Sequence, residues 1–163
     1  MRRILLVAAV ILCAGPGKAD AMYLGVGPMI GVPFGLSAKL WTKTGFALDA
    51  GIGYSWWADS SVQVHGDMLF HSVRLTKDAA EDGQLGLFMG LGLQARMREP
   101  LEQNMRMALR MPLGLEYFLP HLPLSIYGEI VPRFNLGTTD QYFGGDADAG
   151  FRFYWVMGSS SLS

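Results

Sequence analysis

The sequence has only one cysteine, Cys13, in 163 residues. A single cysteine excludes an intramolecular disulfide and any zinc site built on several cysteines. There is no excess of charge of one sign, since 13 Lys and Arg stand against 14 Asp and Glu. Nucleic-acid-binding domains are usually basic, so we expect no nucleic-acid partner. Half of the residues are hydrophobic, which is too many for a disordered chain.

The first 21 residues resemble an export signal in composition. A basic start precedes the apolar run Ile4–Ala14, and Ala19 and Ala21 place small residues at the −3 and −1 positions of a cleavage site. The run is shorter than the roughly 20 residues that a membrane-spanning helix needs. We therefore predict a signal peptide over 1–21, cleaved after Ala21, and one domain over 22–163.

Beyond the signal, no stretch offers 18 consecutive apolar residues, so a helical membrane span is excluded. Apolar residues instead recur at every second position, which indicates β-strands. In 85–98, for example, leucine and methionine alternate with glycine and polar residues. We predict eight strands, at 23–31, 36–43, 45–57, 62–73, 85–98, 105–118, 124–136 and about 147–156. The turns are expected at 32–35, 44–45, 58–61, 76–84, 99–104, 120–123 and 137–145.

The two faces of these strands indicate which side meets lipid. The apolar face is bulky and continuous, whereas the opposite face is rich in glycine and carries scattered charges of both signs. A closed barrel in lipid accounts for both faces, because the apolar side chains then meet lipid while the glycines and charges line the lumen. Closure also satisfies every backbone hydrogen bond, as the bilayer requires. The predicted fold is all-β, an antiparallel eight-stranded transmembrane β-barrel of the outer-membrane type, with outer-membrane lipid around it.

An eight-stranded barrel has an interior just wide enough for side chains. Buried charges are costly unless they are paired, so nearly balanced charges fit a salt-bridged lumen better than a water-filled pore. The predicted luminal charge network consists of Lys39, Asp49, Asp67, Arg96, Arg106, Arg110, Glu116, Glu129, Arg133, Asp148 and Arg152. Aromatic residues near the strand ends suggest interface girdles. They are Tyr54, Trp56, Tyr117, Phe118, Phe153 and Trp155.

The last strand resembles the C-terminal signal by which outer-membrane barrels are recognised for assembly. Asp148, Gly150, Phe153 and Trp155 match its polar, glycine and two aromatic positions. The resemblance implies the barrel-assembly machinery as a partner during biogenesis. An eight-residue tail follows Trp155, whereas in many such proteins the aromatic residue is the last one.

Several short motifs resemble a family of small outer-membrane β-barrel proteins best known from spirochaetes. They are Gly31-Val-Pro33-Phe-Gly35-Leu-Ser-Ala-Lys39-Leu-Trp41, Asp67-Met-Leu-Phe-His71, Arg110-Met-Pro112-Leu-Gly114-Leu-Glu-Tyr117, Glu129-Ile-Val-Pro132 and Gly150-Phe-Arg152-Phe-Tyr-Trp155. The resemblance implies an eight-stranded outer-membrane barrel and brings no catalytic residues.

Few residues suggest catalysis or metal binding. His65, Asp67 and His71 share a strand face, but His71 lies roughly 20 Å from His65 along an extended strand, too far for one metal ion. His65 with Ser60 or Ser61 is the one arrangement worth testing for a lipid-modifying enzyme. The methionines at 105, 107 and 111 fit a lipid face better than a copper site. We therefore expect no catalytic residue, no metal and no cofactor.

The interpretation favoured by these features is a non-catalytic outer-membrane barrel with a structural or surface-interaction role. An even number of strands places both termini on the periplasmic side and four short loops outside. Arg96, Arg98, Arg106 and Arg110 flank one outer loop, 99–104, where they could bind an anionic surface ligand. The alternatives are a narrow pore, a lipid-modifying enzyme and a soluble periplasmic barrel with an apolar ligand cavity.

Overall fold

The computed structural model describes residues 22–43, 45–56, 60–74, 83–98, 105–137 and 142–157. The predicted signal peptide, its cleavage site and the end of the C-terminal tail lie outside these ranges. The described strands are β1 (Met22–Val32), β2 (Phe34–Lys43), β3 (Phe46–Ser55), β4 (Ser61–Arg74), β5 (Gln84–Arg98), β6 (Met105–Arg110), β7 (Leu113–Phe118), β8 (Leu124–Leu136) and β9 (Phe143–Met157). The described residues include no helix long and apolar enough to cross a membrane.

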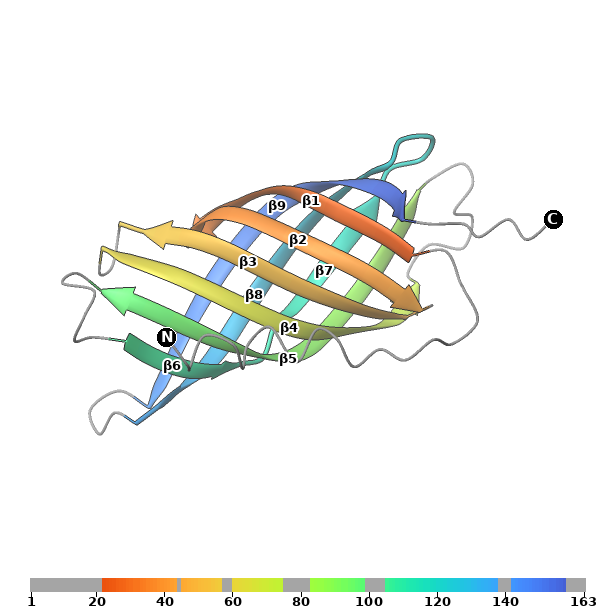
Figure 1. The fold of residues 1–163 in the computed structure, drawn as a ribbon. Coiled ribbons are helices and arrows are strands. Elements are labelled where there is room, and N and C mark those ends of the chain that lie inside the picture. Colours follow the sequence, from red (N-terminus) through yellow and green to blue (C-terminus); the bar gives the residue numbers. More distant parts are fainter. Residues whose placement is uncertain are drawn as a thin grey trace.

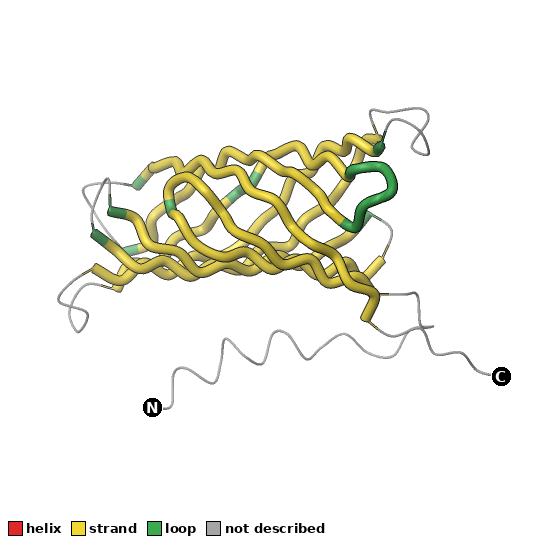
Figure 2. The backbone as a smooth tube through the Cα atoms, turned by 90° about the horizontal axis from the view of Figure 1, so that it is seen from above, coloured by secondary structure: helices red, strands yellow, loops and turns green. Residues whose placement is uncertain are grey.

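All strand pairs are antiparallel, consecutive strands pair except β6 with β7, and β9 pairs back with β1. The sheet therefore closes into a barrel, which Figure 1 shows from the side and Figure 2 from above. β1 begins and β9 ends at the same end of the barrel, on the right in Figure 1. We call this end of the barrel the terminal end and the opposite end the loop end.

β6 and β7 are two halves of one strand, because both pair with β5 on one side and β8 on the other. The strand is interrupted at Met111 and Pro112 because proline has no N–H to donate to the ladder. The register is the same before and after the break. Gly92 faces Arg110 and Met89 faces Leu113, so three steps along β5 match three steps along its partner. The barrel thus has eight strands, which confirms the predicted fold class.

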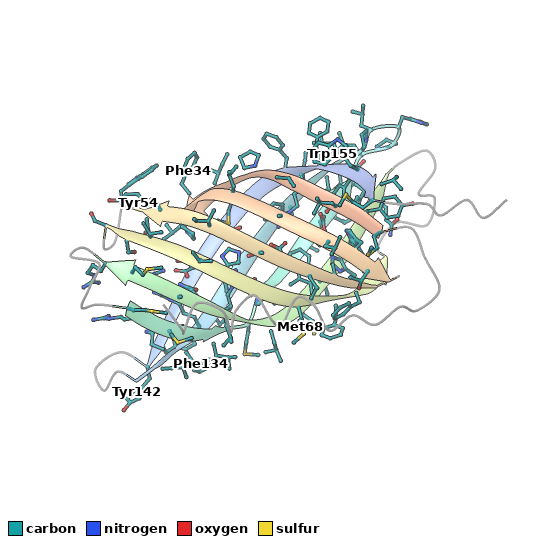
Figure 3. All side chains as sticks on the ribbon, viewed as in Figure 1. Phe34, Tyr54, Met68, Phe134, Tyr142 and Trp155 are labelled. Carbon is teal, nitrogen blue, oxygen red and sulfur yellow. The ribbon has the colours of Figure 1, made fainter. Side chains whose placement is uncertain are left out.

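Side chains alternate between the lumen and the outer surface, apart from register shifts at Trp41–Lys43 in β2 and His71–Val73 in β4. Away from the strand ends, the outward positions of the described strands hold no charged residue, and large apolar side chains stand exposed along every strand (Figure 3). Exposed aromatic rings gather near both ends. At the loop end these are Phe34, Tyr54, Trp56, Phe134, Tyr142 and Phe143, and at the terminal end Tyr23, Phe70, Phe153 and Trp155. This is the apolar band with two aromatic girdles of the outer-membrane type.

Most predicted boundaries differ from the structure by one to four residues, and β8 coincides with the expected 124–136. Two expected turns are shorter than predicted. Phe34 already belongs to β2, and Phe143 already belongs to β9 because it pairs with Phe134. Phe118 was expected in an outer girdle, but its ring lies inside the barrel, with centroids 6.0 Å from Trp41 and 5.6 Å from Tyr154. Its even position in the strand places it on the luminal face.

Candidate functional site in the lumen

The centre of the lumen holds an ion pair between Lys39 on β2 and Glu116 on β7. Both side chains are 0 % exposed. Glu116 also accepts hydrogen bonds from the hydroxyls of Ser125 at 2.6 Å and Tyr154 at 2.8 Å. The ammonium of Lys39 lies 3.0 Å from Nε2 of His71. A buried carboxylate with this many donors is well compensated for the loss of water.

Aromatic rings surround this ion pair on the side of the terminal end. Nζ of Lys39 lies 5.0 Å from the ring centre of Trp41 and 4.8 Å from that of Phe88. Trp41 in turn stacks against His71 at 4.2 Å between ring centres. With Phe118 and Tyr154, these rings form an aromatic floor across the terminal end of the lumen. The cation thus gains cation–π attraction as well as its carboxylate.

Arg152 on β9 connects further strands to this ion pair. Its Nη2 donates to Oδ2 of Asp49 at 2.6 Å, and its Nε donates to the hydroxyl of Ser37 at 2.8 Å. Nη1 lies 3.7 Å from Oε1 of Glu116, and the guanidinium stacks 3.6 Å from the ring centre of Tyr127. One side chain therefore links strands on three sides of the lumen.

Arg110 on β6 forms the next layer toward the loop end. Its Nε lies 3.1 Å from Oδ1 of Asp67 on β4, and its Nη2 donates to Oε1 of Glu129 on β8 at 3.1 Å. The two carboxylates come from the strands on either side of the β5–β6 pair. Arg110 is buried, so the layer crosses the lumen without contact with solvent.

The layer nearest the loop end is built around Asp146 on β9. Nη2 of Arg96 donates to its carboxylate at 3.2 Å, and Nε of Arg133 lies 3.7 Å away. The same Arg96 nitrogen donates to Oε1 of Gln63 at 2.8 Å. Asp146 was not predicted, because it lies between the expected turn 137–145 and the expected start of the last strand at 147. The available signal was its even residue number, which it shares with Asp148, a residue that was predicted to face the lumen.

Two residues of the predicted network stand apart from these contacts. The side chain of Arg106 is exposed at the loop end, although the residue faces Arg96 in the register. Asp148 is buried opposite Glu129, and its Oδ1 has no hydrogen-bond partner in the described part of the chain. The structure thus brings seven of the predicted charges into contact with one another, whereas Arg96 and Arg133 contact Asp146 instead. The contacts also involve polar partners that sequence reasoning did not single out, such as Ser37, Ser125, Tyr154 and Gln63.

The histidines of β4 lie apart from each other in this arrangement. His71 belongs to the Lys39 and Glu116 centre, whereas the ring of His65 lies over Gly51, where a Cβ atom would come within 2.4 Å of it. The described residues include no group of three or more His, Cys, Asp or Glu arranged to hold a metal ion. Ser61 is four residues before His65 on the same strand, roughly 13 Å away along it, so the two do not form a nucleophile and base pair.

Comparison with known proteins finds the fold but no family. No known protein family and no curated protein matches the sequence. Among solved structures, the chain is similar to the N-terminal β-barrel domain of Pseudomonas aeruginosa OprF. The TM-score is 0.64 at 12% sequence identity, and the match covers 83% of this chain and 98% of that domain. At this identity the similarity concerns the fold alone, and it agrees with the eight-stranded barrel described above.

Proposed function

We propose that the chain is an outer-membrane β-barrel that crosses the bilayer, conducts no ions and carries no catalytic centre. The membrane location is supported by the outward surface, which is apolar along every described strand and bordered by aromatic rings at both ends. Strands of this kind match the roughly 25 Å apolar band of outer-membrane barrels. The spirochaete-type family stays a prediction from the sequence motifs.

One observation supports a closed lumen, namely that the charged side chains halfway along it are completely buried. Lys39 and Glu116 are 0 % exposed, and Arg110 and Arg152 are 1 % and 2 % exposed. Water that passed along the lumen would touch these groups. They instead contact each other and the aromatic floor, so ions have no hydrated route past them. A structural or surface-interaction role follows for the barrel.

The test is fractionation followed by recording in planar bilayers. We expect the protein in the outer-membrane fraction, as a gel band whose mobility shifts on boiling because the barrel resists detergent until heated. Purified and inserted into bilayers, it is expected to show no steady conductance, with a porin as the positive control. Steady conductance would contradict the closed lumen. A soluble periplasmic band without a mobility shift would contradict the membrane location and favour a barrel with an apolar ligand cavity.

The absence of catalysis is tested separately, through His65. This residue is buried in the lumen, away from the lipid that an acyl hydrolase or transferase would have to reach. We expect expression of the protein to leave the acylation of lipid A and phospholipids unchanged in mass spectra. A change that is present with the unaltered protein and lost in His65→Ala would contradict this proposal.

The even number of strands puts both termini on one side of the membrane, and we propose that this is the periplasmic side. With both termini in the periplasm, the loop end with Arg106 faces outward and is where an anionic surface ligand would bind. Recognition by the barrel-assembly machinery is proposed from the residues Asp148, Gly150, Phe153 and Trp155 of β9. The proposed orientation is tested with single cysteines at Ser60 and His121, at opposite ends of the barrel, labelled from outside intact cells. Only the cysteine at Ser60 is expected to react.

A further inference from the structure

A layer of polar groups without partners lies in the lumen between Arg110 and Arg96. Its centre is Gln94 on β5, which is 2 % exposed. Neither the amide oxygen nor the amide nitrogen of Gln94 has a hydrogen-bond partner in the described residues. The same holds for Nδ1 of His65 and Nε2 of Gln63 on β4. Buried polar groups in proteins are almost always paired, so these atoms require a partner.

The strand register brings these groups to one space. His65 faces Gln94 directly, and Gln63 faces Arg96 one step nearer the loop end. Directly opposed residues on one face have Cβ atoms about 5 Å apart, which places the imidazole and the amide beside each other. The Gln94 amide nevertheless has no hydrogen bond to His65. A water molecule can bridge two polar groups that are near each other but not directly bonded. On the other side of Gln94 stands Ala108, whose methyl group leaves room.

Guanidinium groups border the same space from both directions along the strands. Arg110 faces Gly92, which is the luminal position of β5 next to Gln94. Nη1 of Arg110 has no hydrogen-bond partner in the described chain. Arg96 is the next luminal position of β5 on the other side of Gln94, and its Nε also has no hydrogen-bond partner in the described chain. Donors therefore approach from both sides of the Gln94 amide.

The amide itself selects the class of ligand. Gln94 needs a donor for its oxygen and an acceptor for its nitrogen. An anion such as chloride could serve only the nitrogen, and a metal cation could serve only the oxygen. Water provides both, and buried water typically makes about three hydrogen bonds to groups of this kind. We propose that the lumen contains a hydration site centred on Gln94, where bound water joins its amide to His65 and to the guanidinium groups of Arg96 and Arg110.

The experiment counts long-lived water in the folded protein in detergent micelles. Magnetic relaxation dispersion of ¹⁷O water is compared between the unaltered protein, Gln94→Leu and a matched control, Leu93→Ala, whose side chain stands on the outer surface. The dispersion amplitude is expected to fall by at least one bound water in Gln94→Leu and to stay unchanged in the control. An unchanged amplitude in folded Gln94→Leu would overturn the proposal.

A second measurement decides the question even where Gln94→Leu does not fold. In the unaltered protein, the side-chain amide protons of Gln94 are expected to show nuclear Overhauser contacts to water. Their absence overturns the hydration site. Both measurements use the folded barrel in micelles, so they are independent of membrane location and conductance. A conducting barrel that retains the bound water would contradict the proposed function alone.

Discussion

Lys39 and Glu116 are 77 residues apart in the sequence and form an ion pair in which neither side chain is exposed to solvent. The strands that carry them, β2 and β7, are not neighbours in the sheet. The pair therefore crosses the lumen, and it joins the two walls through charge where a soluble protein would use an apolar core.

Removal of Glu116 is expected to destabilise the barrel strongly. Glu116→Ala leaves the ammonium of Lys39 buried without its carboxylate, which costs about 3–5 kcal/mol. The measurement is the free energy of unfolding in urea with the protein in lipid vesicles. In the double variant Lys39→Met with Glu116→Leu, the unpaired charge is gone, and most of the loss is expected to be recovered. A double variant as unstable as Glu116→Ala would show that the charge is not the cause.

Exchange of Arg152 for lysine is expected to destabilise the barrel although the charge is kept. Lysine cannot reproduce the separate hydrogen bonds to Ser37 and Asp49 or the stacking on Tyr127. We expect Arg152→Lys to lower the free energy of unfolding by about 1–3 kcal/mol. The control is Arg106→Lys at the exposed loop end, expected to change it by less than about 0.5 kcal/mol. Equal effects of the two changes would contradict the specific role of Arg152.

Two glycines on opposite faces of the wall are expected to respond differently to alanine. A Cβ atom on Gly27 would lie 1.7 Å from the carbonyl oxygen of Phe151, a contact that only a backbone shift relieves. Gly27→Ala is therefore expected to lose the heat-modifiable band. A Cβ atom on Gly128 meets nothing within 4 Å. Gly128→Ala is expected to retain the band and to gain up to about 1 kcal/mol, because alanine restricts the unfolded chain.

A charge on the outer surface tests the contact with lipid directly. Leu91 stands exposed in the middle of β5, and an arginine at the bilayer midplane costs about 2–4 kcal/mol. We expect Leu91→Arg to lower the free energy of unfolding in vesicles by this amount. Leu122→Arg in the turn after β7 is the control, with an expected cost below about 1 kcal/mol, since the residue lies at an end of the barrel. No cost at Leu91 would mean that β5 faces water.

The sequence predicts the wall of the barrel well, because lipid outside and a narrow lumen inside impose the same alternation on every strand. β8 follows its expected bounds for this reason. The alternation says less about where a strand ends. The last strand was expected to begin at 147, after Asp146, and only the pairing in the register shows that β9 has already begun there.

The partners in the lumen could not be predicted, because they depend on which strands face each other across the barrel. Arg96 contacts Asp146, and Lys39 contacts Glu116, across strands that share no register. Arg106 has the luminal parity but stands exposed, because it lies near the loop end where the wall no longer encloses it. The alternation predicts whether a side chain faces the lumen or the outer surface, but not how deeply it is buried.

The position of Arg152 in the last strand affects the order in which the barrel can form. Its contacts to Asp49 and Ser37 span 103 and 115 residues. The guanidinium of Arg152 reaches Asp49 only when β9 joins the wall, so this ion pair cannot form before the barrel closes. Contacts between such distant residues make folding slow, since the loop must close before they form. Closure of the wall by β9 and neutralisation of Asp49 are therefore one event, which makes the final strand the step that commits the chain to its folded state.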